Sequence, residues 1–331
     1  MPPIRMMPRA ATFSLLLLFA IAGVCAGISF GSVPIGAREI LGAFAGSSSS
    51  ATRDILFELR LPRVAAAFSC GGLLALAGAL LQVLLRNPLA DPYIFGVSGG
   101  AALGVLTGML LGLGLLTQTG LGLGGALAAL LLVFGLSFRS GDWNPYRLLL
   151  TGVVVAAGLG ALLSLILVLA PQTAVKGMLF WLMGDLSHAR NPWPALAVLV
   201  LLLAATAPLT QAMNVLALGR DKAQSLGVAV TSVEIMLYLL AAVATLTAVL
   251  IGGTIGFVGL IVPHMVRLLG LADHRWLLPA VVFAGGGLLV LADTAARSVW
   301  APTQLPVGVL TALLGVPVLL LLLSGKSHVA R

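Results

Sequence analysis

The sequence predicts an all-α polytopic membrane protein with about ten transmembrane helices, one of them short or broken near residues 255–268. Of the 331 residues, 60% are hydrophobic and only 8% are charged, whereas roughly 25% of a soluble domain is charged. Mean hydropathy is +1.13, and the apolar residues fall into runs of about 20, the length that crosses a bilayer as a helix. These observations exclude a soluble enzyme, a disordered chain and a peripheral basic protein. They leave no room for a sizeable extramembrane domain, so we treat 1–331 as a single transmembrane domain.

The first element is an apolar run over 13–30 that follows Arg5 and Arg9. A cleaved signal peptide also begins with basic residues before an apolar run. This run is long, however, and nine more follow it, so we expect an uncleaved first span. A polar connector, 31–60, comes next and contains four consecutive serines at 47–50.

Nine further apolar runs account for the rest of the chain. They cover residues 64–84, 93–110, 113–136, 148–170, 193–210, 232–251, 255–268, 276–296 and 306–324. The run at 255–268 is short, and glycines at 252, 253, 256 and 259 surround its start. Glycines inside an apolar run indicate a broken helix, which is tolerated where other protein covers the backbone.

The distribution of Lys and Arg predicts the orientation. An even number of spans places both termini on one side of the membrane. With the termini in the cytoplasm, eleven of the 18 Lys and Arg residues face that side, as the positive-inside rule expects. Arg60, Arg63 and Arg297 fall on the other side and need another explanation.

Motifs for catalysis, metal binding and cofactor binding are missing from the sequence. The GKS at 325–327 is not a phosphate-binding loop, because Leu320 stands where its first glycine would be. Neither Cys25 nor Cys70 has metal-ligand spacing around it. We therefore expect a protein that is not an enzyme and that holds no metal or cofactor.

Three smaller features have ordinary structural interpretations. Glu234 lies near a cytoplasmic helix start, where the helix dipole favours an acid. Asp293 and Arg297 are four residues apart, so they share a helix face and can form an ion pair; an ionisable pair at membrane depth is also a functional candidate. Glycines at 100, 104, 108 and 112 form a smooth stripe that lets another helix approach closely.

The segment 213–228 is a long polar loop on the cytoplasmic side, with a short helical stretch between two Leu-Gly pairs. It is either an ordinary connector or a small amphipathic helix that docks in a groove of another protein. Its candidate docking residues are Leu218, Gly219, Arg220, Asp221, Lys222, Ala223, Leu226 and Gly227.

A series of motifs in one order resembles the FecCD-type permeases, the membrane subunits of ABC importers for iron-siderophores, haem and cobalamin. The motifs are RLPR at 60–63, Gly78, Gln82, RNPLADP at 86–92, GVSG at 96–99, WLMGD at 181–185, the Leu-Gly pairs at 218–219 and 226–227, GFVGLIVPH at 256–264 with Arg267, Ala292-Asp293 with Arg297, LPVG at 305–308 and GVP at 315–317. They span nearly the whole chain after the first run.

The resemblance implies a cobalamin-importer permease-like fold of ten spans and a homodimer that encloses the substrate path at its interface. It also implies two cytoplasmic ATP-binding subunits, which receive 213–228 as a coupling loop, and a periplasmic substrate-binding protein. Arg60, Arg63 and Arg297 match positions that contact glutamates of the binding protein in the family. Fixed guanidinium groups suit such contacts, since they bind carboxylates in a bidentate manner.

The resemblance further places the cytoplasmic gate at Asn87 and Leu89 and at Asn144 and Pro145. The second pair departs from the small hydroxyl residues expected there.

We therefore expect the permease of an ATP-driven importer in the bacterial inner membrane, which carries a metal chelate and has no nucleic-acid partner. An ion-coupled secondary transporter is the alternative, but it needs a carboxylate deep in the membrane, and none is found. A membrane enzyme acting on lipids would need a cluster of polar catalytic residues. His264 belongs to a family motif at a cytoplasmic helix end and has a structural interpretation. Nothing in the sequence selects one chelate.

Overall fold

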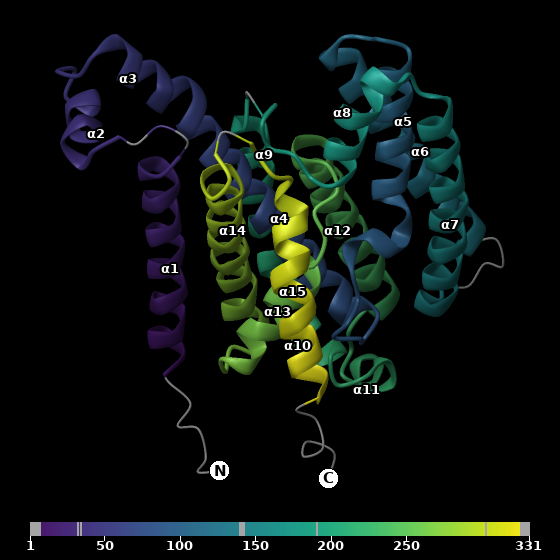
Figure 1. Ribbon diagram of the computed structural model, residues 1–331. Coiled ribbons are helices and arrows are strands. Elements are labelled where there is room, and N and C mark those ends of the chain that lie inside the picture. Colours follow the sequence, from purple (N-terminus) through teal and green to yellow (C-terminus); the bar gives the residue numbers. More distant parts are fainter. Residues whose placement is uncertain are drawn as a thin grey trace.

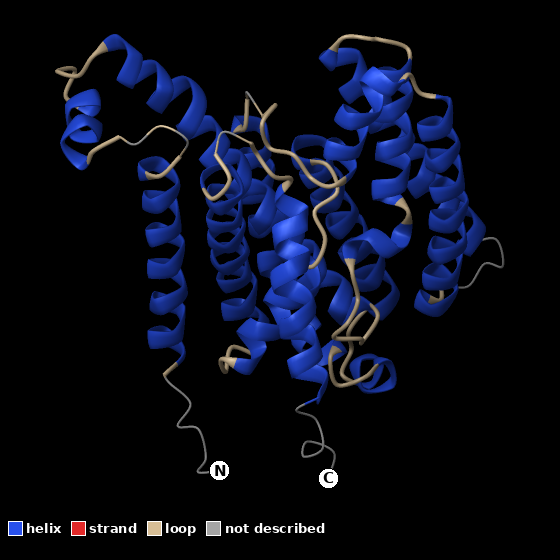
Figure 2. Cartoon of the chain, in the orientation of Figure 1, coloured by secondary structure: helices blue, strands red, loops and turns tan. Residues whose placement is uncertain are grey.

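The computed structural model describes residues 8–31, 33, 35–138, 143–189, 191–301 and 303–324. Within these residues every regular element is a helix (Figure 2). The ten apolar helices are α1 (Arg9–Ser29), α4 (Leu61–Leu84), α5 (Val97–Leu110), α6 (Leu115–Phe138), α7 (Pro145–Leu169), α9 (Trp193–Thr206), α12 (Val230–Gly252), α13 (Val258–Leu268), α14 (His274–Ser298) and α15 (Val307–Ser324). In the described residues seven spans are long and apolar enough to cross a membrane, and α5, α13 and α15 contain shorter apolar stretches. These helices match the ten predicted runs and confirm the fold class.

Two regions that hydropathy left as connectors are partly helical. The first contains α2 (Ala37–Phe44), α3 (Ser50–Asp54) and a π-helix, η1 (Ile55–Arg60), which runs directly into α4. Caps explain α3 and α2: the hydroxyl of Ser49 accepts a hydrogen bond from the Thr52 amide, and Glu39 accepts one from the Gly36 amide. The second contains α8 (Gln172–Leu182). The expectation of a polar connector over 31–60 was therefore incomplete.

Helix α4 is the centre of the bundle, and almost all of its residues are buried. It packs against α14, α12, α13 and α9. Two of these crossings need glycine, because a Cβ on Gly71 would collide with the carbonyl of Gly285, and one on Gly78 with the carbonyl of Gly259. Close backbone approach through small residues is the usual way in which membrane helices associate.

The glycine stripe of α5 makes the same kind of contact. A Cβ on Gly100 or Gly104 would collide with backbone of α6, and one on Gly108 would contact Gln118. Gly112 has open space around it and lies in a turn at φ +65°. The packing interpretation is confirmed for the first three glycines.

The short helix expected at 255–268 is α13, which has only 11 residues. Between the end of α12 and its start, residues 253–257 are non-helical, with φ +68° at Gly253 and +71° at Phe257. Tyr93 fixes this segment from the 3-10 helix η2 (Pro92–Phe95). Its hydroxyl donates to the Ile255 carbonyl at 3.0 Å and accepts from the Ile255 amide at 2.8 Å, so the broken backbone is satisfied by protein, as membrane burial requires.

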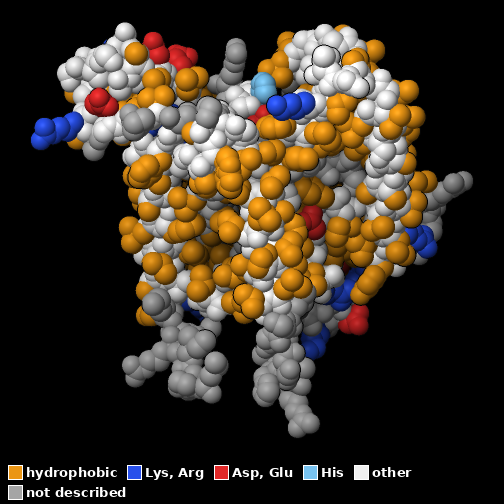
Figure 3. All heavy atoms as spheres, viewed as in Figure 1, with side chains coloured by type: hydrophobic (Ala, Val, Ile, Leu, Met, Phe, Trp, Pro, Cys, Tyr) orange, Lys and Arg blue, Asp and Glu red, His pale blue; other side chains and the backbone are white. Residues whose placement is uncertain are grey.

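The bundle has two different ends (Figure 1). At one lie α2 and α3; at the other α1 begins, α15 ends, and two short helices lie, α10 (Thr210–Leu216) and α11 (Arg220–Ser225). We call these the arginine end and the α11 end. Hydrophobic side chains cover most of the middle of the visible face, and charged side chains gather mainly toward its ends (Figure 3). Residues 1–7 and 325–331, including the GKS, lie outside the described residues.

Candidate functional site

A cluster of charged side chains forms at the arginine end, where η1 meets α4 and α14 finishes. Arg63 binds Asp293 with both Nε and Nη2, at 2.9 to 3.1 Å, and its Nη1 donates to Gln304 at 2.9 Å. Arg297 lies on the other side of the same carboxylate, with Nε 3.5 Å from Oδ2. The predicted pair of Asp293 and Arg297 is thus present, but Arg63 is the closer partner.

Arg60, Arg63 and Arg297 lie together in the structure. Arg60 and Arg297 also make backbone contacts that the sequence did not predict. Arg60 is 4% exposed, and its guanidinium donates to the carbonyls of Ile28 and Ser29 at 2.7 and 2.8 Å and to that of Val33. Arg297 is 6% exposed and donates to the carbonyl of Gly27. Carbonyls at a helix end have no intrahelical partner, so both arginines fasten the end of α1. Both side chains are largely buried, although both border the hollow beside Arg63, and their contact with a binding protein stays a prediction.

Arg63 remains partly accessible, with 14% of its side chain exposed. It borders a hollow of about 530 Å³ at the surface, which Glu58, Ser187 and Gln304 also line. Arg63 and Arg297 share the buried Asp293, and Arg60 and Glu58 border the same hollow, so three positive charges stand against two negative ones. Such a surface attracts an acidic partner.

The predicted coupling segment folds as two short helices, α10 and α11, joined by a tight turn. Gly219 and Gly227 have φ of +119° and +81°, the conformations that favour glycine over other residues. Leu218 and Leu226 are 62% and 65% exposed, although both are apolar. The exposed side chains around them include Asp221 and Lys222, while Ala223 is buried against the bundle. The segment therefore offers two leucines and a set of charges to a partner.

Polar contacts fix α10 and α11 to the bundle. The Asn214 amide donates to Asp273 at 2.8 Å and accepts from the backbone amide of His274 at 3.0 Å. The hydrogen bond that the Asn214 side chain donates to Asp273, together with one from the backbone amide of Arg275, lowers the pKa of Asp273 below its ordinary value. In α11, Arg220 Nη1 lies 3.6 Å from Glu234 Oε2.

Sequence reasoning missed this role of Glu234. A helix-dipole interpretation applies to the first turn, but Glu234 is the fifth residue of α12 and is fully buried. No spacing signal could identify it, because its partner lies in a different helix and the contact depends on how the two helices pack.

The four predicted gate residues lie in turns or at helix starts. The carboxamide of Asn87 accepts from the Leu89 amide at 2.9 Å, and that of Asn144 accepts from the Tyr146 amide at 2.9 Å as the N-cap of α7. Leu89 is 38% exposed and Pro145 is buried. Both asparagines thus shape their own turns, and whether these segments form a gate stays a prediction.

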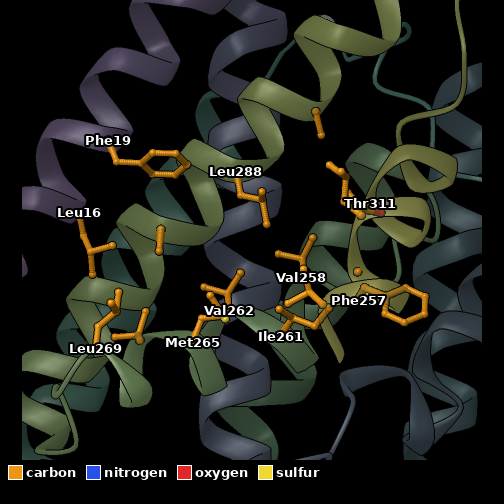
Figure 4. A pocket seen from close by; sticks show the side chains of 16 residues that line it. Leu16, Phe19, Phe257, Val258, Ile261, Val262, Met265, Leu269, Leu288 and Thr311 are labelled. Atoms are coloured by element: carbon orange, nitrogen blue, oxygen red, sulfur yellow. The ribbon is translucent and has the colours of Figure 1, made fainter. Parts of the chain in front are cut away.

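An apolar groove of about 280 Å³ lies between α1, α13, α14 and α15. Figure 4 shows Phe19 and Thr311 on its two sides, with Leu288 and Ile261 between them. Its lining is almost entirely apolar, and the hydroxyl of Thr311 donates to the Gly308 carbonyl. A polar metal chelate needs donors and acceptors that orient it, so this groove is not suited to hold one.

Comparison with known proteins gives consistent matches over nearly the whole chain. The profile of the FecCD transport family matches residues 16–325. The hemin transport system permease protein HmuU of Yersinia pestis is 38% identical, with 96% of each chain covered. The ferric enterobactin transport system permease protein FepD of Escherichia coli is 39% identical, with 97% of each covered.

A solved structure reported as a metal-chelate type ABC transporter in an inward-facing conformation has a TM-score of 0.84 at 29% identity. It covers 95% of this chain and 98% of its own. The family implies an ATP-hydrolysing partner and a binding-protein partner, and the chain itself is a non-catalytic, multi-pass membrane protein. Taken with the helical bundle and its two ends, these matches show that the chain belongs to the FecCD transport family and is the permease of an ABC importer for metal chelates.

Proposed function

We propose that a homodimer of this chain forms the path for haem, a ferric siderophore or cobalamin through a bacterial inner membrane, with both termini in the cytoplasm. The observation that carries the proposal is similarity along the full length to permeases named for hemin and for ferric enterobactin. The identities are nearly equal, so they favour the class of cargo and not one member of it.

One ATP-binding subunit docks at the α11 end of each copy, so the homodimer binds two. Exposed leucines beside charged residues suit a helix that inserts into a groove, and Leu218 and Leu226 supply them. The turns at Gly219 and Gly227 bracket this helix, which packs on the bundle through Ala223 and leaves both leucines exposed. Docking here would carry the motion of the ATP-binding subunits to the spans.

The second copy covers the apolar surfaces that α7 and α15 leave uncovered. Only three residues of the 25-residue α7 are buried within the chain, and only Val307, Thr311 and Gly315 are buried among residues 307–321 of α15. Uncovered apolar helices need lipid or protein beside them. We propose that the second copy packs on these two helices, because the substrate path of the family lies at a dimer interface.

The binding protein docks at the arginine end, over the surface that Arg63 reaches. Arg60 and Arg297 line the same hollow with little exposed area, and they also hold the end of α1 in place. Replacing all three arginines would therefore confuse docking with folding. Arg63 is the most accessible of the three but is also the closest partner of buried Asp293, so a charge reversal there needs a folding control.

Transport proceeds by alternating access. The loaded binding protein docks, ATP binding closes the partner subunits, and α11 moves the spans so that the segments around Asn87 and Leu89 and around Asn144 and Pro145 open the cytoplasmic side.

Uptake into proteoliposomes tests the proposal. The complex is reconstituted with ATP inside, and radiolabelled haem, ferric enterobactin and cobalamin are each presented with the binding protein. We expect ATP-dependent uptake of one of the three. Uptake driven by a proton or sodium gradient without ATP would instead favour the secondary transporter, and ATP-driven uptake of none would exclude these three compounds as cargo.

A further inference from the structure

The carboxyl group of Glu234 is the most deeply buried acid at the α11 end. Its residue is 0% exposed, and among the described residues neither carboxyl oxygen has a hydrogen-bond partner of good geometry. Buried charges are normally paired, since burial without a partner is costly. The permease mechanism above gives this group no role, although it lies beside the coupling segment.

Arg220 of α11 is its nearest cationic partner, with 3.6 Å between Nη1 and Oε2. The same guanidinium reaches the carbonyl of Trp143 at 3.4 Å and the hydroxyl of Thr231 at 3.3 Å. One arginine therefore joins the coupling helix to α12 and to the segment that leads into α7. Trp143 directly precedes the proposed gate residues Asn144 and Pro145.

Two further groups face the same carboxyl group. The indole of Trp143 is buried beside it, and Arg86 is close enough to interact with it electrostatically. Arg86 has φ +48°, an uncommon backbone conformation for a residue other than glycine, and directly precedes Asn87. Glu234 thus lies where the coupling helix meets the segment that leads into α7, within electrostatic range of the residue that precedes Asn87.

The surrounding aromatic residues make this meeting point rigid. Trp143 packs edge-on against Tyr238, with 6.2 Å between ring centroids, and lies 6.0 Å from Phe134. Tyr238 follows Glu234 by one helical turn and is also fully buried. Close-packed interiors transmit displacements because they cannot be compressed.

We propose that Glu234 is a positioning residue that transmits movement of α11 to the gate segments at 86–89 and 143–145. The inference rests on the proposed function, since it assumes that α11 receives the motion of an ATP-binding subunit. A displaced Arg220 draws the carboxylate and the Trp143 backbone with it, because Glu234 is fully buried and a buried charge is costly without its partner.

Double-mutant analysis of the complex in nanodiscs and proteoliposomes tests this role. The variants are Glu234→Gln, Arg220→Gln and the two combined, with Arg275→Gln as the matched control, because Arg275 is an exposed arginine at the same end. For Glu234→Gln we expect unchanged assembly, basal ATP hydrolysis within about twofold of wild type, and at least a tenfold lower ratio of cargo imported to ATP hydrolysed. Arg220→Gln alters the docking segment itself, so its ratio is measured per assembled complex, where we expect a loss of the same size. The combined variant should be no worse than Glu234→Gln, and the control should match wild type. If the fold-loss in the ratio of cargo imported to ATP hydrolysed for the combined variant equalled the product of the two single fold-losses, the proposal would be overturned.

Hydrogen exchange of the permease without partners provides a second readout. Arg220→Gln should raise exchange both in α11 and at residues 143–148, whereas Arg275→Gln should raise neither. Arg220→Lys, which keeps the charge, should retain most of the wild-type protection that Arg220→Gln loses. This comparison does not require Glu234→Gln to fold. Faster exchange confined to α11 would overturn the proposal. The exchange experiment needs neither cargo nor ATP, so it tests the role of Glu234 separately from the proposed function. A wild-type complex that shows no ATP-driven uptake would count against the proposed function only.

Discussion

Arg60 illustrates why a charged residue near a membrane surface is difficult to interpret from sequence. It breaks the positive-inside pattern, so a partner on the outside was the natural explanation. The structure instead directs its guanidinium to three backbone carbonyls at and beyond the end of α1. Likewise, the spacing of Asp293 and Arg297 predicts their pair, but no local spacing predicts Arg63, which approaches from 230 residues away in the chain.

The fastening role of Arg60 predicts a stability effect. Arg60→Met leaves the carbonyls of Ile28, Ser29 and Val33 without this donor, and we expect a loss of about 2–4 kcal/mol in the free energy of unfolding. Thermal unfolding of the purified protein measures it. Arg53→Met, at an exposed position in α3, is the matched control and should stay within about 0.5 kcal/mol. Equal unfolding temperatures for the two variants would contradict the fastening role.

Asp273 predicts a dependence on pH. Its pKa is lowered in the folded protein by the hydrogen bonds from Asn214 and Arg275, so the ionised form stabilises the fold. This stabilisation is complete above the ordinary value of 3.8 and is lost as the pH falls through the lowered folded value. The unfolding temperature of Asp273→Asn should therefore lie below wild type at neutral pH, and the gap should narrow below about pH 4. A gap that persists unchanged in acid would contradict the assignment.

At the scale of elements, hydropathy predicts long helices well and short ones poorly. All ten apolar runs form helices, because a membrane offers no other partner for the backbone of an isolated segment. The glycines before 258 correctly indicate the break before α13. Helices α2, α3 and α8 escaped prediction because they are short, and because capping residues and packing, not an apolar run, determine them.

The hydroxyl of Tyr93 makes two hydrogen bonds to the broken segment, which Thr254 also anchors by donating to the Leu182 carbonyl. Tyr93→Phe removes both of its hydrogen bonds to Ile255 and should cost about 1–3 kcal/mol of unfolding free energy. Amide exchange at 254–258 should accelerate at the same time, as hydrogen-exchange mass spectrometry can detect. Tyr146→Phe is the control, since Tyr146 is 66% exposed. Unchanged exchange at 254–258 would show that other contacts hold the segment.

The crossing of α5 and α6 gives a paired test of glycine. A Cβ on Gly104 would collide with the backbone of α6, so Gly104→Ala should lower the free energy of unfolding by about 1–3 kcal/mol. Gly124 on α6 has nothing within 4 Å of an added Cβ, so Gly124→Ala should be neutral or stabilising by up to about 1 kcal/mol. Thermal unfolding compares the two. The same sign for both would contradict the packing observed here.

In the molecule as a whole, the charged residues that we interpret lie at two ends, which bind different partners in the proposed function. The α11 end presents leucines and charges on a short helix, and the arginine end presents a positive cluster around one aspartate. Helix α14 extends between them, from the contact of Asp273 with Asn214 to the contact of Asp293 with Arg63. Sequence predicted that both groups exist, but their internal contacts, including Glu234, emerged only from the packing of distant segments.

Site-specific photo-crosslinking tests this two-ended account most directly. A photoreactive amino acid is placed at Leu226 of α11 or at Thr303, an exposed residue of the arginine end, and the complex is irradiated with both partners present. The account predicts that position 226 crosslinks to the ATP-binding subunit and position 303 to the binding protein. Crosslinks with the partners exchanged, or an ATP-binding subunit that never crosslinks to 226, would contradict it.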